Sequence, residues 1–170
     1  QEKKQETDEY NEDDNVIAIE TETVNVKTEP KAKLETKTNL QTKLEEIVAA
    51  DNDFDIDEFI SGARIAFEYI LNAYATGDAN ELKPLLSDEV FNNFNVSIRE
   101  REMAGQTMEE TLIGISKAEL IEAEMEGTVV QLTVKFISDQ IHALKDSNGN
   151  VVEGDPDKIV SITDFWTFTR

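Results

Sequence analysis

The sequence predicts an α+β domain in which N-terminal helices pack on one face of a curved antiparallel sheet. Between residues 55 and 105, apolar side chains recur every three or four positions, as in an amphipathic helix. From about residue 111 the apolar period becomes two, as in a half-buried strand, and glycine-containing turns separate the strands. Helices grouped on one face of an antiparallel sheet define the α+β class. A curved sheet closed by helices forms a cone with a cleft, and such clefts are common ligand sites.

The aromatic residues and glycines place the folded part in the C-terminal two-thirds of the chain. Eleven of the twelve aromatic residues lie at Phe54 or later, and all seven glycines lie at Gly62 or later. Large apolar side chains build cores and glycines build turns. We therefore expect a disordered charged tail over residues 1–38, and a domain over 39–170 that opens with an amphipathic helix at 39–50.

Three further helices are predicted from their capping residues. Asp55 followed by Glu58 forms a capping box. The acidic run from residue 51 to 58 also resembles the opening of a calcium loop, but glycine is absent from its sixth position and glutamate from its twelfth. The residues predicted to begin and to limit the three helices are Asp55 and Gly77, Asp78 and Pro84, and Ser87 and Gly105.

Strands follow the helices. We predict a long bent strand over about 111–125, a turn at Gly127, an alternating strand over 130–136 and a last strand over 160–168. The apolar parity changes after Phe136, which predicts a bulge and a bend there. Asn148-Gly149 is a hairpin signal.

The composition excludes several classes of function. The chain of 170 residues has 37 acidic and 16 basic side chains, a net charge of −21, which argues against binding of nucleic acid. It has no cysteine and one histidine, so a disulfide scaffold, a thiol nucleophile and a cysteine- or histidine-rich metal site are excluded. No apolar run approaches the ~20 residues of a membrane span. We expect no cofactor and no metal.

One basic stretch interrupts the acidic chain. Residues 26–43 contain five lysines and two glutamates, a net charge of +3. This segment is either a linker or a weak tether to an anionic membrane, and the apolar stripe of the helix at 39–50 either packs on the domain or lies in a membrane interface. The candidate membrane or partner contacts are Lys27, Lys31, Lys33, Lys37, Leu40, Lys43, Leu44, Ile47 and Val48.

The predicted cleft has one acidic residue on an apolar strand face. Asp164 shares this face with Trp166 and Phe168. We interpret Asp164 as a buried acid paired with Arg99 or Arg101, because an unpaired buried charge costs several kcal/mol. The alternative is a pocket base in a small-ligand binder or enzyme. The cleft candidates are Tyr69, Tyr74, Asp164, Trp166 and Phe168, while His142 is expected at the rim of the sheet.

An ordered set of short motifs, together covering roughly residues 53–170, resembles a known family. They lie at 59–67, 77–78, 82–87, 101–105, 112–115, 134–141, 149–157 and 164–168, and the chain ends in Trp-Thr-Phe-x-Arg. This set resembles the C-terminal domain of the Tim44-like family, whose members are similar to the nuclear transport factor 2-like cone fold.

The resemblance implies a role without catalysis. The eukaryotic family member is a peripheral adaptor on the matrix face of the mitochondrial inner membrane, where it contacts cardiolipin-containing membrane and joins the presequence translocase to a chaperone. Bacterial relatives, notably of alphaproteobacteria, keep the domain and commonly carry an N-terminal anchor. The implied location is the cytoplasmic face of a bacterial inner membrane, with protein partners from a translocation system. We also expect an anchor before Gln1 and a further strand after Arg170.

Overall fold

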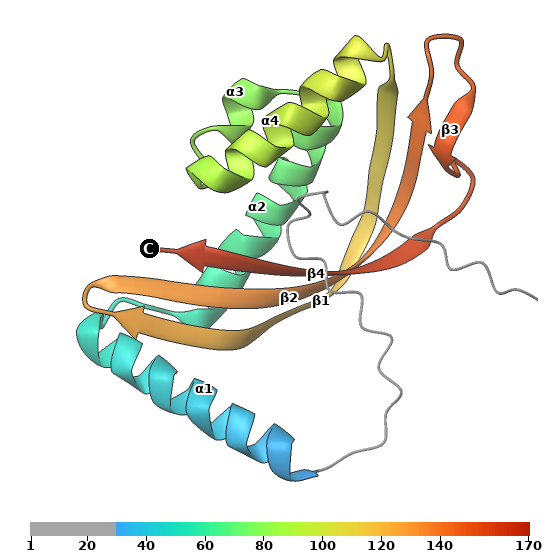
Figure 1. The fold of residues 1–170 in the computed structure, drawn as a ribbon. Coiled ribbons are helices and arrows are strands. Elements are labelled where there is room, and N and C mark those ends of the chain that lie inside the picture. Colours follow the sequence, from blue (N-terminus) through green and yellow to red (C-terminus); the bar gives the residue numbers. More distant parts are fainter. Residues whose placement is uncertain (1–29) are drawn as a thin grey trace, which may run out of the picture.

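The computed structural model describes residues 30–170, with side chains from residue 39 onward. Within these residues, four helices precede four strands (Figure 1). Their bounds are α1 Pro30–Ala50, α2 Ile56–Thr76, α3 Ala79–Leu82, α4 Asp88–Met103, β1 Thr107–Glu126, β2 Val129–Lys145, β3 Val151–Gly154 and β4 Val160–Thr169. All pairs of neighbouring strands are antiparallel. The predicted α+β class is therefore confirmed.

Local capping fixes the ends of α2, as the sequence predicts. The side chain of Asp55 accepts a hydrogen bond of 2.8 Å from the backbone nitrogen of Glu58. Gly77 ends the helix with φ +77°, a conformation that only glycine adopts without strain. The predicted caps of α3 and α4, Asp78 and Ser87, also accept from the backbone three residues on.

Helix α1 is longer than predicted. It begins at Pro30 and not at residue 39. Proline is favoured in the first turn of a helix, where its missing N–H has no partner to lose. The predicted start at residue 39 was based only on the apolar residues that begin at Leu40, and the helix continues toward the N-terminus before them. Of the predicted tail, residues 1–29 lie outside the described part of the chain.

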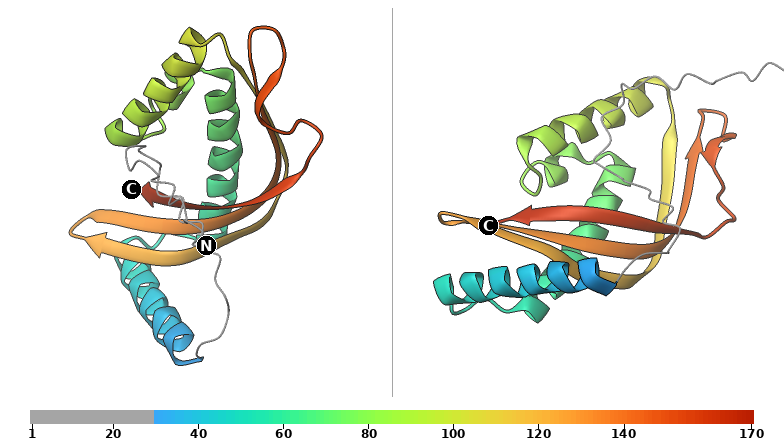
Figure 2. Two further views of the ribbon diagram at one scale, coloured as in Figure 1. Left: turned by 45° about the vertical axis from the view of Figure 1, so that its right-hand side comes forward. Right: turned by 60° about the horizontal axis from the view of Figure 1, so that its bottom comes forward.

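Strand β2 is the centre of the sheet. It pairs with β1 along almost its whole length, with β4 over Gln131–Gln140 and with β3 near its end. Strand β1 has 20 residues where β2 has 17, and the surplus is taken up at three register shifts in β1. Such bulges bend a strand and increase its twist. The sheet consequently curves around α2 (Figure 2).

The bulge predicted after Phe136 is wrong. Strand β2 pairs with β4 without interruption from Gln131 to Gln140, and the irregularities lie in β1. The inward face continues beyond Phe136 through Ser138 and Gln140, which are 0% and 4% exposed. These two side chains are polar, so the apolar residues change parity after Phe136 although the inward-facing positions of the strand continue through Gln140.

The core lies between the helices and the inner face of the sheet. Its aromatic centre is Phe67 of α2, whose ring lies 4.4 Å from Phe136 and 4.8 Å from Trp166 between centroids. A second cluster joins α1 to the sheet through the contact of Ile47 with Ala123 and Leu132. Helices α1 and α2 thus cover neighbouring parts of one sheet face.

Candidate functional site

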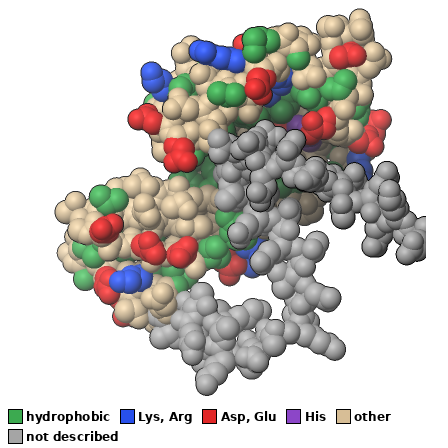
Figure 3. All heavy atoms as spheres, in the orientation of Figure 1, with side chains coloured by type: hydrophobic (Ala, Val, Ile, Leu, Met, Phe, Trp, Pro, Cys, Tyr) green, Lys and Arg blue, Asp and Glu red, His purple; other side chains and the backbone are tan. Residues whose placement is uncertain are grey.

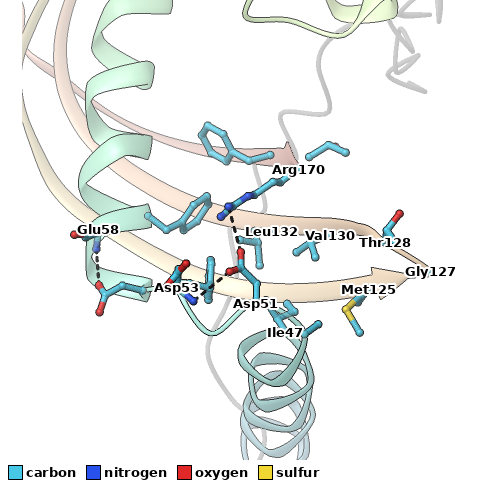
Figure 4. Close-up of a pocket in the computed structure, with 16 residues that line it drawn as sticks. Ile47, Asp51, Asp53, Glu58, Met125, Gly127, Thr128, Val130, Leu132 and Arg170 are labelled. Carbon is cyan, nitrogen blue, oxygen red and sulfur yellow. Dashed lines mark hydrogen bonds and ion pairs between the residues drawn. The ribbon is translucent and has the colours of Figure 1, made fainter.

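A pocket of about 610 Å³ lies where α1 meets the sheet (Figure 4). Four segments that are distant in sequence surround it. These are the end of α1 with the loop to α2, the first turn of α2, the β1–β2 turn and the last residues of β4. Its lining residues are Ile47, Ala50, Asp51, Asp53, Phe54, Asp55, Glu58, Phe59, Met125, Gly127, Thr128, Val130, Leu132, Phe168, Thr169 and Arg170.

Many of the pocket's lining side chains are apolar, and several of these are held in place by packing. Leu132 and Ile47 are 3% and 2% exposed. Phe59 packs edge-on against Phe168, with 5.6 Å between the ring centroids, and lies 6.2 Å from Phe54. A site of this kind suits an apolar side chain or acyl chain from a binding partner.

The charged residues that line the pocket are mainly acidic. The lining includes four carboxylates, from Asp51, Asp53, Asp55 and Glu58, and one guanidinium, that of Arg170, so its formal charge balance is −3 (1 − 4). Arg170 Nη2 forms an ion pair of 3.2 Å with Asp51 Oδ2, which joins the end of β4 to the loop after α1. A partner whose apolar group is flanked by lysine or arginine would complement this lining, and an anionic head group would be repelled.

The predicted cleft residues do not converge on this pocket. Phe168 alone among them lines it. Tyr69 is 44% exposed on α2. Tyr74 packs against Phe94 with 4.8 Å between centroids, and Trp166 is part of the aromatic core.

The interpretation that pairs Asp164 with Arg99 or Arg101 is wrong. Within the described residues, no ion pair or hydrogen bond of the Asp164 side chain is present. Burial raises the pKa of Asp164 above its ordinary value, and the negative charge of Glu110 raises it further. The nearby charge that acts on this acid is therefore of the same sign.

Arg101 instead holds the end of α2. It is 8% exposed, and its Nη2 donates to the carbonyl oxygens of Tyr74 at 2.7 Å and Ala75 at 3.2 Å. Its guanidinium also lies over the Tyr74 ring, 5.2 Å from the centroid. The carbonyl end of a helix carries partial negative charge, and a buried cation there is favourable. Sequence reasoning missed this role because backbone acceptors carry no residue signature.

The candidate contacts at the N-terminal end have different surroundings. Lys27 lies outside the described residues, and Lys31, Lys33 and Lys37 fall in α1 before the described side chains begin. Leu40, Leu44 and Ile47 pack against the sheet. Lys43 pairs with Glu46 at 2.8 Å, and Val48 is 41% exposed. The apolar stripe of α1 is therefore used in packing on the domain.

Over the described residues, no helix has the combined length and apolar character that a bilayer crossing requires.

Comparison with known proteins identifies the family. The sequence profile of the Tim44-like domain matches residues 40–170. The chain belongs to the Tim44-like domain family. The chain is 28% identical over 163 residues to the mitochondrial import inner membrane translocase subunit TIM44 of Rattus norvegicus, covering 95% of this chain and 36% of the rat protein. It is 25% identical over 134 residues to TIM44-1 of Arabidopsis thaliana, covering 79% of this chain and 28% of that protein.

The human TIM44 subunit is 24% identical over 135 residues, with 79% of this chain and 30% of the human protein covered. The chain thus spans about a third of the length of these curated relatives. Among solved structures, a designed β-sheet protein is 16% identical, covering 64% of this chain and 91% of its own, with a TM-score of 0.24. That score is too low to support any argument.

Proposed function

We propose that this Tim44-like domain is a non-enzymatic adaptor that docks protein partners at a membrane in a translocation system. The family match over residues 40–170 and relatives named as subunits of the inner membrane translocase support this proposal. The proposed location is the cytoplasmic face of a bacterial inner membrane, the equivalent of the mitochondrial matrix face. The likeness to the nuclear transport factor 2-like cone also belongs to the proposal, supported by the curved sheet with helices on one face.

The observation that carries the proposal is the pocket between α1 and the sheet. Its apolar side chains and charge balance of −3 suit a polypeptide segment that presents an apolar side chain between basic ones. The cleft candidates offer no comparable arrangement, because Tyr69 is exposed and Tyr74 and Trp166 are engaged in packing. An adaptor requires such a docking site and no reacting groups.

Charge reversal at the pocket tests partner docking. The probe is a fluorescent amphipathic peptide that carries leucine and arginine, measured by anisotropy against the full chain. Asp53→Lys with Glu58→Lys should weaken binding by about tenfold or more, because two attractive contacts become repulsive. The matched control is Glu153→Lys with Asp157→Lys, which changes the net charge by the same amount on β3 and in the turn after it. Equal weakening by both pairs would show that the pocket does not select the peptide.

Vesicle flotation tests the membrane contact. Each lysine near an anionic surface contributes ~1 kcal/mol, so a segment of net charge +3 gives salt-sensitive binding. Replacing Lys27, Lys31, Lys33 and Lys37 with Gln lowers the charge of residues 26–43 to −1 (3 − 4) and should abolish flotation with anionic vesicles at low salt. Substitution is preferable to deletion of residues 26–50, because Ile47 is part of the core.

The control for flotation replaces four lysines of the folded part, Lys83, Lys117, Lys135 and Lys158, with Gln. This variant has the same net charge and should still float. If the unmodified chain does not bind anionic vesicles at low salt, direct lipid contact is wrong and docking through a protein partner is the form of the proposal that survives.

A further inference from the structure

Helix α1 has an exposed face that no other described element covers. The helix packs on the sheet through Leu40, Leu44 and Ile47, and in Figure 1 it lies at the edge of the molecule with its opposite side open to solvent. On the open side Val48 is 41% exposed, and Glu45 is exposed as well. One exposed valine is ordinary on a protein surface, so the sequence of the whole helix decides whether this face has a partner.

The charges of α1 are arranged against its dipole. Residues 31–37 contain three lysines and one glutamate, a net charge of +2 (3 − 1), whereas residues 44–50 contain two glutamates and no base. No acid lies in the first turn and no base lies in the last. The N-terminal end of a helix has partial positive charge and the C-terminal end has partial negative charge, so each end carries side chains that it repels. A second helix lying antiparallel would place the basic half of one helix beside the acidic half of the other.

The apolar pattern of the exposed face fits such a second helix. Leu34, Gln41 and Val48 recur at intervals of seven residues, which is about two turns, so the three positions fall on one face of α1. A second copy of α1 lying antiparallel across this face, with a two-fold axis at Gln41, would bring Leu34 of each copy to Val48 of the other. Two apolar contacts would then flank the axis, as in a packed helix pair.

The same register brings opposite charges together. Lys37 of one copy lies beside Glu45 of the other, and Lys31 lies beside the acidic loop at 51–53, because the residue numbers of facing positions sum to 82, twice 41. Glu45 accepts a hydrogen bond of 3.3 Å from Gln41, but it has no cationic partner among the described side chains. The acidic loop belongs to the docking pocket, whose charge balance is −3. Figure 3 shows that acidic side chains predominate on the visible surface of the lower part of the molecule, where α1 lies.

The basic start of α1 cannot reach the docking pocket of its own chain. The helix is continuous from Pro30 to Ala50, and its last turns and the loop that follows line the pocket. At about 1.5 Å per residue, Lys31 lies about 30 Å from Asp51 along the helix axis. The lysines of the first turn therefore meet this kind of acidic surface only on another molecule.

We propose that two copies of this chain associate through antiparallel α1 helices, and that the basic start of each helix covers the mouth of the other copy's docking pocket. A two-fold pair closes on itself, because each copy gives and receives the same contacts. The association is independent of the proposed function, whereas its effect on the pocket rests on that function, as a means of keeping the docking site closed. The net charge of −21 on each copy opposes the contact, and a single helix pair is a small interface, so the dimer is weak.

Reversal of the charges on each half of α1 tests the dimer. Sedimentation velocity follows the full chain over a range of protein concentrations in about 0.1 M salt, where charges more than about 10 Å apart are screened. Lys31→Glu with Lys33→Glu and Lys37→Glu, the basic-half variant, should weaken self-association by about tenfold or more. Glu45→Lys with Asp53→Lys, the acidic-half variant, should do the same. An equimolar mixture of the two variants should associate again, because each reversed half then meets its opposite charge.

The controls separate this effect from misfolding and from net charge. Both variants give α1 charges that its dipole favours, so neither should lose stability in urea unfolding of the dilute chain. Replacing three exposed bases elsewhere, Lys83, Arg99 and Lys158, with Glu changes the net charge by −6, as in the basic-half variant, and should leave the self-association in place.

The fluorescent leucine- and arginine-containing peptide of the docking experiment tests the closed pocket. At protein concentrations at which the unmodified chain is dimeric, the peptide should bind it about tenfold more weakly than it binds the basic-half variant. Equal binding would show that the dimer leaves the pocket open. A peptide that binds neither chain would contradict the proposed function while the sedimentation result still decides the dimer.

Three sedimentation results would overturn the dimer. These are an unmodified chain that stays monomeric up to about 1 mM, a mixture of the two variants that does not associate, and a control variant that loses self-association as fully as the basic-half variant does.

Discussion

Replacement of Arg101 by methionine should cost this domain a large part of its stability. The guanidinium is 8% exposed and donates to the carbonyl oxygens of Tyr74 and Ala75, at 2.7 and 3.2 Å. Methionine keeps much of the apolar stem but supplies neither donor nor charge. Tyr74 O retains a bond from the nitrogen of Gly77, whereas Arg101 is the side-chain donor to Ala75 O.

The magnitude follows from these contacts. A hydrogen bond from a charged donor contributes about 1.5–3 kcal/mol, and the cation over the Tyr74 ring, 5.2 Å from its centroid, adds about 0.5–2 kcal/mol. Allowing for the retained stem, Arg101→Met should lower the free energy of unfolding by about 3 kcal/mol, out of the ~5–15 kcal/mol usual for a domain. Arg101→Lys keeps the charge and one donor, and should cost about half as much.

Urea unfolding followed by the fluorescence of the single tryptophan, Trp166, measures these changes. The control is Arg99→Met, an exposed arginine on the same helix, which should change the free energy of unfolding by less than about 0.5 kcal/mol. The reasoning is refuted if Arg101→Met costs less than about 1 kcal/mol, or if Arg99→Met is equally destabilising.

Three other substitutions, the first two each paired with a comparison substitution, give distinct expected results. Phe67→Ala removes a fully buried ring between Phe136 and Trp166 and should cost about 3–5 kcal/mol in urea unfolding, while Tyr69→Ala, at an exposed position, should cost far less. Gly154 has φ +74°, and Gly154→Ala places a Cβ against the carbonyl oxygen of His142. This substitution should separate β3 from β2, which would be seen as faster amide hydrogen exchange in these strands. Gly62→Ala, in open space on α2, should instead stabilise the domain by about 0.5–1 kcal/mol. Asp164 has a pKa raised by burial and by the charge of Glu110, so the folded state holds its proton more tightly than the unfolded state does. The contribution of Asp164 to the free energy of unfolding is therefore most favourable at pH values below its ordinary pKa of 3.8, and it is lost as the pH rises through the raised pKa of the folded state. Asp164→Asn should therefore gain stability relative to the unmodified chain between pH 4 and pH 7, and a difference that does not vary with pH would contradict this.

The elements that sequence predicts well are those set by local contacts. The caps at Asp55, Asp78 and Ser87 each involve a backbone nitrogen three residues away, so the residue types alone reveal them. The hairpin at Asn148-Gly149 is equally local, with Gly149 at φ +83° and the Asp146 side chain accepting from the backbone of Asn148. Such signals need no knowledge of the tertiary fold.

The errors arise where partners are distant or polar. The bend predicted for the strand at about 111–125 is present in β1, but the positions of its three bulges are defined by pairing with β2 and cannot be assigned from the sequence of β1 alone. The inner face of β2 continues through Ser138 and Gln140, which an apolar pattern passes over. The docking pocket draws on four separate segments, so its residues could not be grouped before the fold was known.

The docking pocket and the lysine segment of residues 26–43 divide the proposed contacts of this chain by charge. The docking pocket has a formal charge balance of −3, so it would repel a phosphate head group. The five lysines of residues 26–43 lie in the tail and α1. Rising salt should therefore weaken vesicle binding by screening the lysines and peptide docking by screening the pocket acids. The lysine variant should lose vesicle binding and keep peptide docking, and the pocket variant should do the reverse. Loss of both contacts in either variant would mean that membrane and partner share a single surface.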